Sequence, residues 1–288
     1  MRRTIFEQEH ELFRESVEAF VEAEIAPNAE AWDEAGVVDK AMVRKAGEAG
    51  LLGMAIPDQY GGGGVDDFRY NAVLDEVVTG SGHGASGLCI TLHNDICLPY
   101  FLAYADADQK ARWLPGMASG EIMTAIAMTE PGTGSDLAGI KTSAKLDGDA
   151  YLLNGAKTFI TNGINADAVI VVARTGDDPH GGLTLLVVEE GMEGFERGRR
   201  LDKMGLKAQD TSELFFNDVA VPVENRLGAE GSGFFQLVAN LPQERLSIAV
   251  GAVAGAEAAL ALTLEYAKER KAFGRPVGSF QYNRFMLA

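Results

Sequence analysis

A glycine-rich stretch with hydroxyl and acidic side chains is the part of the chain best suited to binding an oxygen-rich ligand. It reads Ala127-Met128-Thr129-Glu130-Pro131-Gly132-Thr133-Gly134-Ser135-Asp136. Its glycines permit positive φ angles and close backbone approach, and its Thr and Ser residues supply hydroxyls. The apolar run 122–128 predicts a β-strand that would hold the loop on a rigid element. The pattern indicates a cofactor loop, with an ordinary exposed turn as the alternative.

A second candidate is the carboxylate of Glu244, in the string Leu241-Pro242-Gln243-Glu244-Arg245-Leu246. A carboxylate removes a proton from carbon efficiently when burial raises its pKa toward that of the carbon acid. Pro242 predicts a chain break followed by a helix start, with Glu244 in the first helical turn. An acid at that place also interacts favourably with the helix dipole, and spacing alone favours this simpler explanation.

A metal site is the rival interpretation from a different class. Cys89, His93 and Cys97 are spaced by four residues each, with Asp95 nearby, so they share one face if the segment is helical. The outer two would then lie about two turns apart, too far for one tetrahedral ion. Free cysteines are usually buried as small apolar residues, and we therefore predict no metal.

Charge and composition restrict the class of protein. The chain has 288 residues with 42 acidic and 25 basic side chains, a net charge of −17, which disfavours a nucleic-acid partner. Two cysteines do not make a disulfide framework, and the N-terminus lacks the pattern of a signal peptide, so we expect a cytoplasmic protein. The apolar run 246–264 has the length of a membrane span, but it contains Glu257 and many small residues. We predict a buried helix and no membrane span.

Periodicity divides the chain into three zones and predicts an α+β multidomain fold. Residues 1–120 read as an all-helical domain, 121–229 as a β-barrel or sandwich, and 230–288 as helical again. Pro27 is expected to stop the first helix, and the Asp147-Gly148 pair to form a hairpin turn. The expected further helices are 41–49, 70–78 and 108–117, and the expected strands are 168–174, 183–189 and 212–216.

Five strings in chain order resemble the acyl-CoA dehydrogenase family. Besides the decapeptide, they are Ile56-Pro57-Asp58-Gln59-Tyr60-Gly61-Gly62, Phe159-Ile160-Thr161-Asn162-Gly163, Lys203-Met204-Gly205-Leu206-Lys207 and Glu269-Arg270-Lys271-Ala272-Phe273-Gly274. The resemblance implies FAD as cofactor and an N-terminal helical domain, a central β-barrel and a C-terminal helical bundle. Because the chain stops at Ala288, we expect that bundle to be incomplete, without the late segment that contacts a neighbouring subunit's flavin.

The resemblance also implies a reaction. A fatty acyl-CoA loses its α-proton to a base and its β-hydrogen as hydride to flavin N5, giving a trans-2-enoyl-CoA. Most members carry the base late in the bundle, whereas the long-chain and isovaleryl branches carry it as a Glu before Arg-Leu, which matches Glu244. The Leu241–Leu246 string and the segment 205–211 are similar to the long-chain branch in particular. The expected acceptor is electron-transfer flavoprotein, and the expected assembly a homotetramer built as a dimer of dimers.

Site residues follow from the same match, position by position. Thr129 and Ser135 would hydrogen-bond the flavin, Thr161 would approach N5, and Arg270 would meet a flavin phosphate across a subunit interface. The thioester carbonyl would be polarised by backbone N–H groups near Glu244 and by the flavin ribityl chain. The residues expected to bind the cofactor are Ile126, Ala127, Met128, Thr129, Gly134, Ser135, Phe159, Ile160, Thr161, Arg270 and Gln281. Those expected to bind the substrate are Ser135, Phe235 and Arg245.

Several alternatives stay open from the residues alone. Phe159 is equally typical of β-core packing, and Arg270 and Gln281 of a polar helix end. Within the family, a branched short-chain (isovaleryl-type) dehydrogenase or an acyl-CoA oxidase is the alternative activity. The alternative to an enzyme is an inactive scaffold that neither binds flavin nor converts a substrate.

Overall fold

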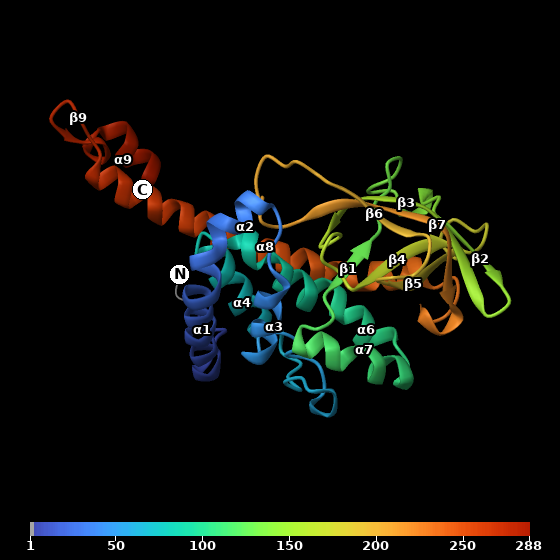
Figure 1. Cartoon of the computed structure of the whole chain (residues 1–288). Helices are drawn as coiled ribbons and strands as arrows, with labels where there is room; N and C mark the ends of the chain where they lie inside the picture. The colour runs from blue at the N-terminus through green and yellow to red at the C-terminus, as the bar shows by residue number, and fades with distance from the viewer. Residues whose placement is uncertain (1–2) are drawn as a thin grey trace.

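The computed structural model describes residues 3–288 and shows helices, then a sheet, then helices along the chain (Figure 1). The first part contains α1 Gln8–Phe20, α2 Ala29–Ala35, α3 Lys40–Glu48, α4 Phe68–Gly80, α5 Gly84–Thr91, α6 Leu98–Tyr104 and α7 Ala107–Ser119. A π-helical turn, Leu92–Cys97, joins α5 to α6 without a break. The expected helices 41–49, 70–78 and 108–117 are thus confirmed as α3, α4 and α7.

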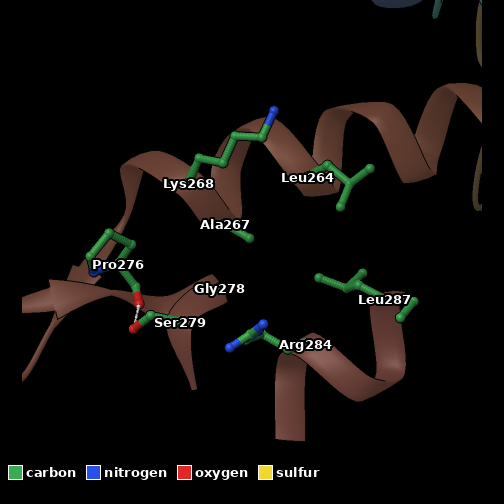
Figure 2. A pocket seen from close by; sticks show the side chains of 9 residues that line it. Leu264, Ala267, Lys268, Pro276, Gly278, Ser279, Arg284 and Leu287 are labelled. Carbon is green, nitrogen blue, oxygen red and sulfur yellow. Dashed lines mark hydrogen bonds between the residues drawn. The ribbon is translucent and has the colours of Figure 1, made fainter. Parts of the chain in front are cut away.

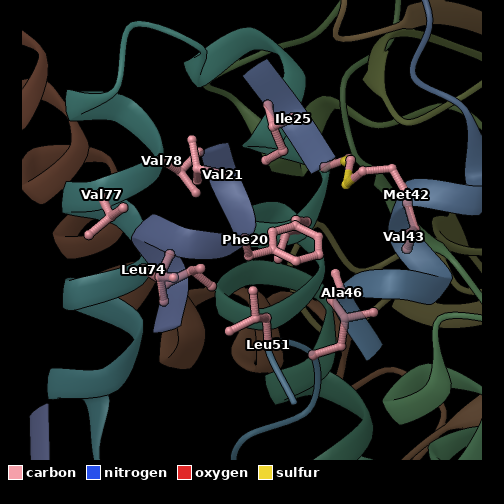
Figure 3. Packing of buried hydrophobic residues seen from close by; sticks show 14 of the residues in the cluster. Phe20, Val21, Ile25, Met42, Val43, Ala46, Leu51, Leu74, Val77 and Val78 are labelled. Carbon is pink, nitrogen blue, oxygen red and sulfur yellow. The ribbon is translucent and has the colours of Figure 1, made fainter. Parts of the chain in front are cut away.

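Aspartates begin three of these helices. The carboxylates of Asp39, Asp67 and Asp106 accept hydrogen bonds from backbone N–H groups in the first turns of α3, α4 and α7. The apolar faces then meet in one core that packs α1 and its π-helical extension against α3 and α4 (Figure 3). Its members include Phe20, Val21, Ile25, Met42, Val43, Ala46, Leu51, Leu74, Val77 and Val78.

The predicted stop at Pro27 is wrong. The chain continues from α1 through a π-helical turn, Val21–Ile25, and a 3₁₀ turn, Ala26–Asn28, into α2. Pro27 lies at the start of the 3₁₀ turn, where its missing N–H group costs no hydrogen bond. The proline changes the type of helix and does not end the helical path.

The middle part forms one eight-stranded sheet. Its strands are β1 Thr124–Ala127, β2 Ser143–Asp147, β3 Ala150–Thr161, β4 Ala168–Arg174, β5 Leu183–Glu189, β6 Phe195–Arg200, β7 Thr211–Pro222 and β8 Arg226–Leu227. Strands 168–174 and 183–189 are confirmed as β4 and β5. The Asp147-Gly148 hairpin is also confirmed, with Gly148 at φ 61° between β2 and β3.

The sheet is open, which corrects the expected barrel. The strand order is β6-β7-β3-β2-β4-β5-β8, with β1 added parallel to β4. Between residues 3 and 288, the end strands β6 and β8 pair only with β7 and β5. Side chains from β2, β3, β4, β5 and β7 still share one core, so the sheet curves around it. Alternate residues of β4 and β5 face a second core against α6 and α7.

The last part is dominated by α8, Gly233–Glu269, a single helix of 37 residues and therefore roughly 55 Å long. A small hairpin follows, β9 Lys271–Ala272 and β10 Arg275–Pro276, and then α9 Gln281–Leu287. The predicted break at Pro242 is wrong, because this proline lies inside α8. One proline removes a single helical hydrogen bond, and packing of α8 along α4 outweighs that loss.

Helix α8 is long and apolar enough to cross a membrane, yet the expected burial is also wrong, since only 11% of its most apolar window is buried. Gly251 and Gly255 face Thr79 of α4, whereas Ile248, Val253 and other large side chains project outward. Small residues therefore mark the side of α8 that contacts α4. Because that side also forms buried polar contacts to protein, we infer that α8 is not a membrane span.

His93 gives the helical part a specific acid sensitivity. Its ring is fully buried; Nε2 donates to the carbonyl of Met117 at 3.1 Å, so Nδ1 accepts from the Thr124 hydroxyl at 2.8 Å. Burial lowers the pKa of His93 to about 4, from 6.5. The unfolded chain thus takes up a proton at a pH where the folded chain does not, and stability falls as the pH drops from 6.5 to about 4.

We expect this one side chain to reduce the free energy of unfolding by about 3 kcal/mol across that interval. Urea unfolding at several pH values measures it. His93→Gln, which keeps an amide donor and acceptor without titrating, should lack this component. If the free energy of unfolding of the two proteins changed in parallel with pH, His93 would accept the proton in the folded state as well, which would contradict this prediction.

Candidate active site

The carboxylate of Glu244 lies in the first half of α8, against the helix that carries Tyr100. The Tyr100 hydroxyl donates a hydrogen bond to Glu244 Oε1 at 2.7 Å, and the Tyr100 side chain is fully buried. Burial raises the pKa of Glu244, while the Tyr100 hydrogen bond and the Arg245 charge oppose that shift. Among the described residues no hydrogen bond reaches Oε2. The group is therefore an anchored carboxylate with one oxygen free to accept a proton.

The position of Glu244 differs from the predicted first helical turn. Glu244 follows eleven residues of α8, so its N–H faces the carbonyl four residues earlier within the helix. The backbone N–H of Glu244 is therefore directed to its own helix, and it does not serve as the expected donor that would polarise a thioester carbonyl. The helix dipole explanation for this acid fails for the same reason, since the dipole acts within the first turn.

The candidate cofactor loop leaves the sheet at the end of β1. Its first residues are tied to β3, because the backbone N–H of Thr158 donates to the carbonyl of Thr129 at 2.9 Å. The structure thus brings the two strings of the predicted cofactor site together. Beyond them, Gly132 and Gly134 have open space where a side chain would start. This part of the loop has room for a ligand close to its backbone.

A buried ion pair anchors the loop from beneath. Lys157 Nζ of β3 lies 3.0 Å from Glu130 Oε1 and donates to the carbonyl of Met128 at 2.9 Å. The Glu130 carboxylate also accepts the backbone N–H groups of Lys141 and Thr142, at 2.8 and 2.9 Å. Burial lowers the pKa of Lys157 to about 8, and the charge of Glu130 opposes the shift. With both charges paired and hydrogen-bonded, the pair fixes the loop on β3.

Phe159 projects from the sheet beside this loop. The register of β3 against β7 shifts between Lys157 and Ile160, and Phe159 has φ 60° and is 67% exposed, while Ile160 is buried. A β-bulge of this kind redirects a side chain, and positive φ in a bulky residue is costly. Core packing is thus not the role of Phe159. An exposed aromatic ring next to an open loop with hydroxyls fits a planar, oxygen-rich cofactor such as FAD.

One hydrophobic cluster connects the loop with Glu244. Tyr100, the hydrogen-bond partner of Glu244, belongs to the core between α6, α7 and the sheet, and Ile126 and Met128 pack against the same core. Ala127, between them, points to the opposite core. The proton-accepting carboxylate and the cofactor loop are therefore attached to two sides of one packed unit.

Four of the predicted residues lie outside this packed unit: Arg270, Gln281, Phe235 and Arg245. Arg270 caps the end of α8, 26 residues or roughly 39 Å beyond Glu244. Gln281 begins α9, which follows the small hairpin in the end of the chain that projects from the rest (Figure 1). Ser135 is exposed in the loop, and Phe235 and Arg245 are exposed on α8. A pocket of about 430 Å³ also lies at this far end, bordered by Leu264, Lys268 and Arg284 (Figure 2). It is not part of the Glu244 site.

Sequence reasoning missed Tyr100 and Lys157. Tyr100 is 144 positions from Glu244, so no local pattern signals their contact. Lys157 stands two residues before Phe159 in a strand with buried neighbours, and a lysine in such a strand was the signal available in the sequence. The alternative of a zinc site at Cys89, His93 and Cys97 is disfavoured, because both ring nitrogens of His93 are hydrogen-bonded to protein groups and neither is available to a metal.

Family models cover most of the chain. The N-terminal domain of acyl-CoA dehydrogenase matches residues 7–121, the middle domain residues 125–219, and the C-terminal domain residues 231–288. The long-chain specific acyl-CoA dehydrogenase of Sus scrofa mitochondria is 46% identical over 99% of the chain, which spans 66% of that relative's length. The mitochondrial isovaleryl-CoA dehydrogenase of Oryza sativa is 37% identical over 99% of the chain, which spans 70% of it.

A solved structure agrees with these matches. The crystal structure of acyl-CoA dehydrogenase from Geobacillus kaustophilus superposes with a TM-score of 0.96 at 46% identity, covering 99% of this chain and 75% of that one. Sequence and fold therefore agree over nearly the whole chain, including the strands and the helix that position the site. The chain belongs to the acyl-CoA dehydrogenase family, a family of FAD-dependent oxidoreductases.

Proposed function

We propose that this chain carries the catalytic base and part of the FAD site of an acyl-CoA dehydrogenase that converts a fatty acyl-CoA to its trans-2-enoyl-CoA. The observation that carries the proposal is Glu244, a half-buried carboxylate with a raised pKa and one oxygen held by buried Tyr100. A base of this kind is what removal of an α-proton from a thioester requires. Family membership supplies the reaction class.

Different residues of the chain have different roles in the proposed reaction. Glu244 accepts the α-proton, and the Tyr100 hydroxyl fixes the orientation of its carboxylate. Thr129, Ser135 and the open backbone around Gly134 hold the cofactor, and Phe159 covers its ring. Ile126, Ala127, Met128, Ile160 and Thr161 complete this side of the site. FAD, when bound, supplies the oxidation by accepting the β-hydrogen as hydride.

Substrate and acceptor are proposed from the relatives. The 46% identity to the long-chain enzyme of Sus scrofa supports a long straight acyl chain, and the 37% identity to the isovaleryl enzyme of Oryza sativa keeps a branched short chain as the alternative. We propose electron-transfer flavoprotein as the acceptor; rapid reoxidation by oxygen would instead indicate an oxidase. The cytoplasmic location remains a prediction.

We also propose a homo-oligomer, arranged as a dimer of dimers. Exposed large apolar side chains run along the outer half of α8, among them Ile248, Val253, Leu260, Leu262 and Tyr266. Surfaces of this kind usually mark protein contacts. Arg270 lies roughly 39 Å from Glu244 along α8, and Gln281 lies in the same projecting end of the chain, which favours a contribution to the flavin of another subunit.

Exchange of Glu244 for Gln should leave the flavin bound and reduce turnover by about 10²–10⁴-fold, because the amide cannot accept the α-proton. The measurement is the visible flavin spectrum before and after anaerobic palmitoyl-CoA or isovaleryl-CoA, together with steady-state rates. Glu257→Gln, an exposed position on the same helix, is the matched control and should keep full activity. Unchanged turnover in E244Q would remove Glu244 from the mechanism; a colourless wild type would favour the inactive scaffold.

Exchange of Glu130 for Gln should weaken FAD binding more than tenfold, because it leaves the Lys157 charge buried and releases the loop from β3. The expected loss of stability is about 3 kcal/mol or more, the usual cost of breaking a buried pair. Flavin fluorescence titration and urea unfolding measure the two effects. Glu190→Gln, which removes an exposed ion pair with Arg197, should change neither appreciably. FAD affinity equal to wild type in folded E130Q would contradict the anchoring role.

A further inference from the structure

Three polar side chains meet in the buried space between α4, the π-helical turn Leu92–Cys97 and α8. They are Asp75, Asp95 and Ser247, which are 4%, 1% and 6% exposed. Ser247 Oγ lies 2.9 Å from Asp75 Oδ2 and 2.7 Å from Asp95 Oδ2. Two carboxyl groups thus share one hydroxyl, away from solvent.

Counting hydrogens at this hydroxyl shows that one carboxyl is protonated. Ser247 has a single hydroxyl hydrogen, and an ionised carboxylate can only accept. Two ionised carboxylates would leave one of the two short contacts of Ser247 without a hydrogen. They would also place two negative charges together in a region of low dielectric, which is costly. One of the two side chains must therefore donate to Ser247 Oγ.

The second oxygen of Asp95 identifies which side chain holds the proton. The side-chain amide of Asn71, on α4, donates to Asp95 Oδ1, so Asp95 receives a donor at each oxygen and is favoured as the carboxylate. Asp75 contacts Ser247 and the carboxyl group of Asp95 itself, and it lies near the negative charge of Glu76. Burial and the Asp95 charge raise the pKa of Asp75 well above its usual range. The hydrogen bonds then run from Asp75 through Ser247 to Asp95.

This arrangement lies one helical turn from Glu244. Ser247 follows Glu244 by three residues on α8, and the side-chain amide of Gln243 donates to the backbone carbonyl of Asp95 at 3.1 Å. The π-helical turn that carries Asp95 leads directly into α6, which carries Tyr100. The same two helical segments therefore meet at the carboxyl pair and at the Tyr100–Glu244 hydrogen bond.

We propose that Asp75 and Asp95 share one proton through Ser247 and that this pair is a positioning element that holds α8 in the register at which Tyr100 meets Glu244. The positioning half rests on the proposed function of Glu244, whereas the shared proton does not. Neither aspartate contacts the reacting atoms. Their role is to lock a buried helix contact through a hydrogen-bond pattern that needs the proton.

The other acidic and histidine side chains near the pair each have a partner of their own, so we assign the titration at this place to the Asp75–Asp95 pair. On α4, Glu76 is paired with Arg14 and Arg3. On the π-helical turn, His93 is directed to Met117 and Thr124. On α8, Glu244 and Arg245 are the charged neighbours in the adjoining turn, with Glu244 bonded to Tyr100.

The first experiment compares Asp75→Asn with Asp95→Asn in the full chain. The amide that D75N introduces can donate to Ser247 Oγ as the protonated carboxyl does but does not titrate, so D75N should be at least as stable as wild type near neutral pH. In D95N the amide nitrogen cannot accept a hydrogen bond, so folding should weaken by more than tenfold relative to D75N. Equal losses in the two variants would overturn the assignment of the proton to Asp75.

Proton uptake gives the pH dependence a definite sign. The pKa of Asp75 is raised in the folded state, so its contribution to stability is full below the unfolded value near 4 and is lost as the pH rises. Between about pH 5 and pH 8, the folding equilibrium constant of wild type relative to D75N should fall about tenfold per pH unit. Infrared difference spectra should show a protonated carboxyl in wild type at neutral pH and none in D75N. Parallel stability profiles, or no such band, would refute the shared proton.

The second experiment tests positioning through the pKa of Glu244, followed by NMR of carboxyl-labelled glutamate and assigned with E244Q. Ser247→Ala removes the bridge, which should weaken the Tyr100 hydrogen bond and raise the pKa of Glu244; D75N should leave it unchanged. An unchanged Glu244 pKa in folded S247A would overturn the positioning role. Neither experiment needs turnover, so an inactive wild type would refute the proposed function and leave this inference to its own tests.

Discussion

Buried polar contacts between α8 and the N-terminal helices determine where the candidate base lies. Asn240, Gln243, Glu244 and Ser247 project from successive turns of α8 and form hydrogen bonds to Tyr104, Asp95, Tyr100 and Asp75. Polar groups in such a place are costly unless paired, so the helix has one register in which all are satisfied. An apolar contact of the same area would tolerate sliding or rotation, and Glu244 would then lose its orientation.

The sheet contributes through a second buried polar contact of a different kind. Lys157 and Glu130 bring opposite full charges together under the cofactor loop, and three backbone groups complete their hydrogen bonds. Such a pair adds little net stability compared with apolar residues, but leaving one charge alone is expensive. The pair therefore restricts the loop to the one conformation that keeps both charges satisfied, and it leaves the open glycines above free to face a ligand.

The two anchored parts are joined by ordinary apolar packing. Ile126 and Met128 contact the core that contains Tyr100, so a shift of the loop relative to α8 would open space in a close-packed interior. The outer half of α8 and the terminal hairpin lack such support within one chain, and their apolar side chains are exposed. The site is thus rigid where the base and loop meet and depends on further contacts where Arg270 and Gln281 lie.

The sequence alone determined the order of helices and strands, and its resemblance to the acyl-CoA dehydrogenase family indicated the candidate base and loop. Local patterns sufficed for the elements because helix and strand periodicity and the Asp147-Gly148 turn act between near neighbours. It misjudged Pro242, since packing along α4 outweighs one lost helical hydrogen bond. Only the tertiary structure decided the open sheet, the Tyr100–Glu244 contact and the proton between Asp75 and Asp95. These depend on groups far apart in sequence, whose energies arise only when folding removes them from water.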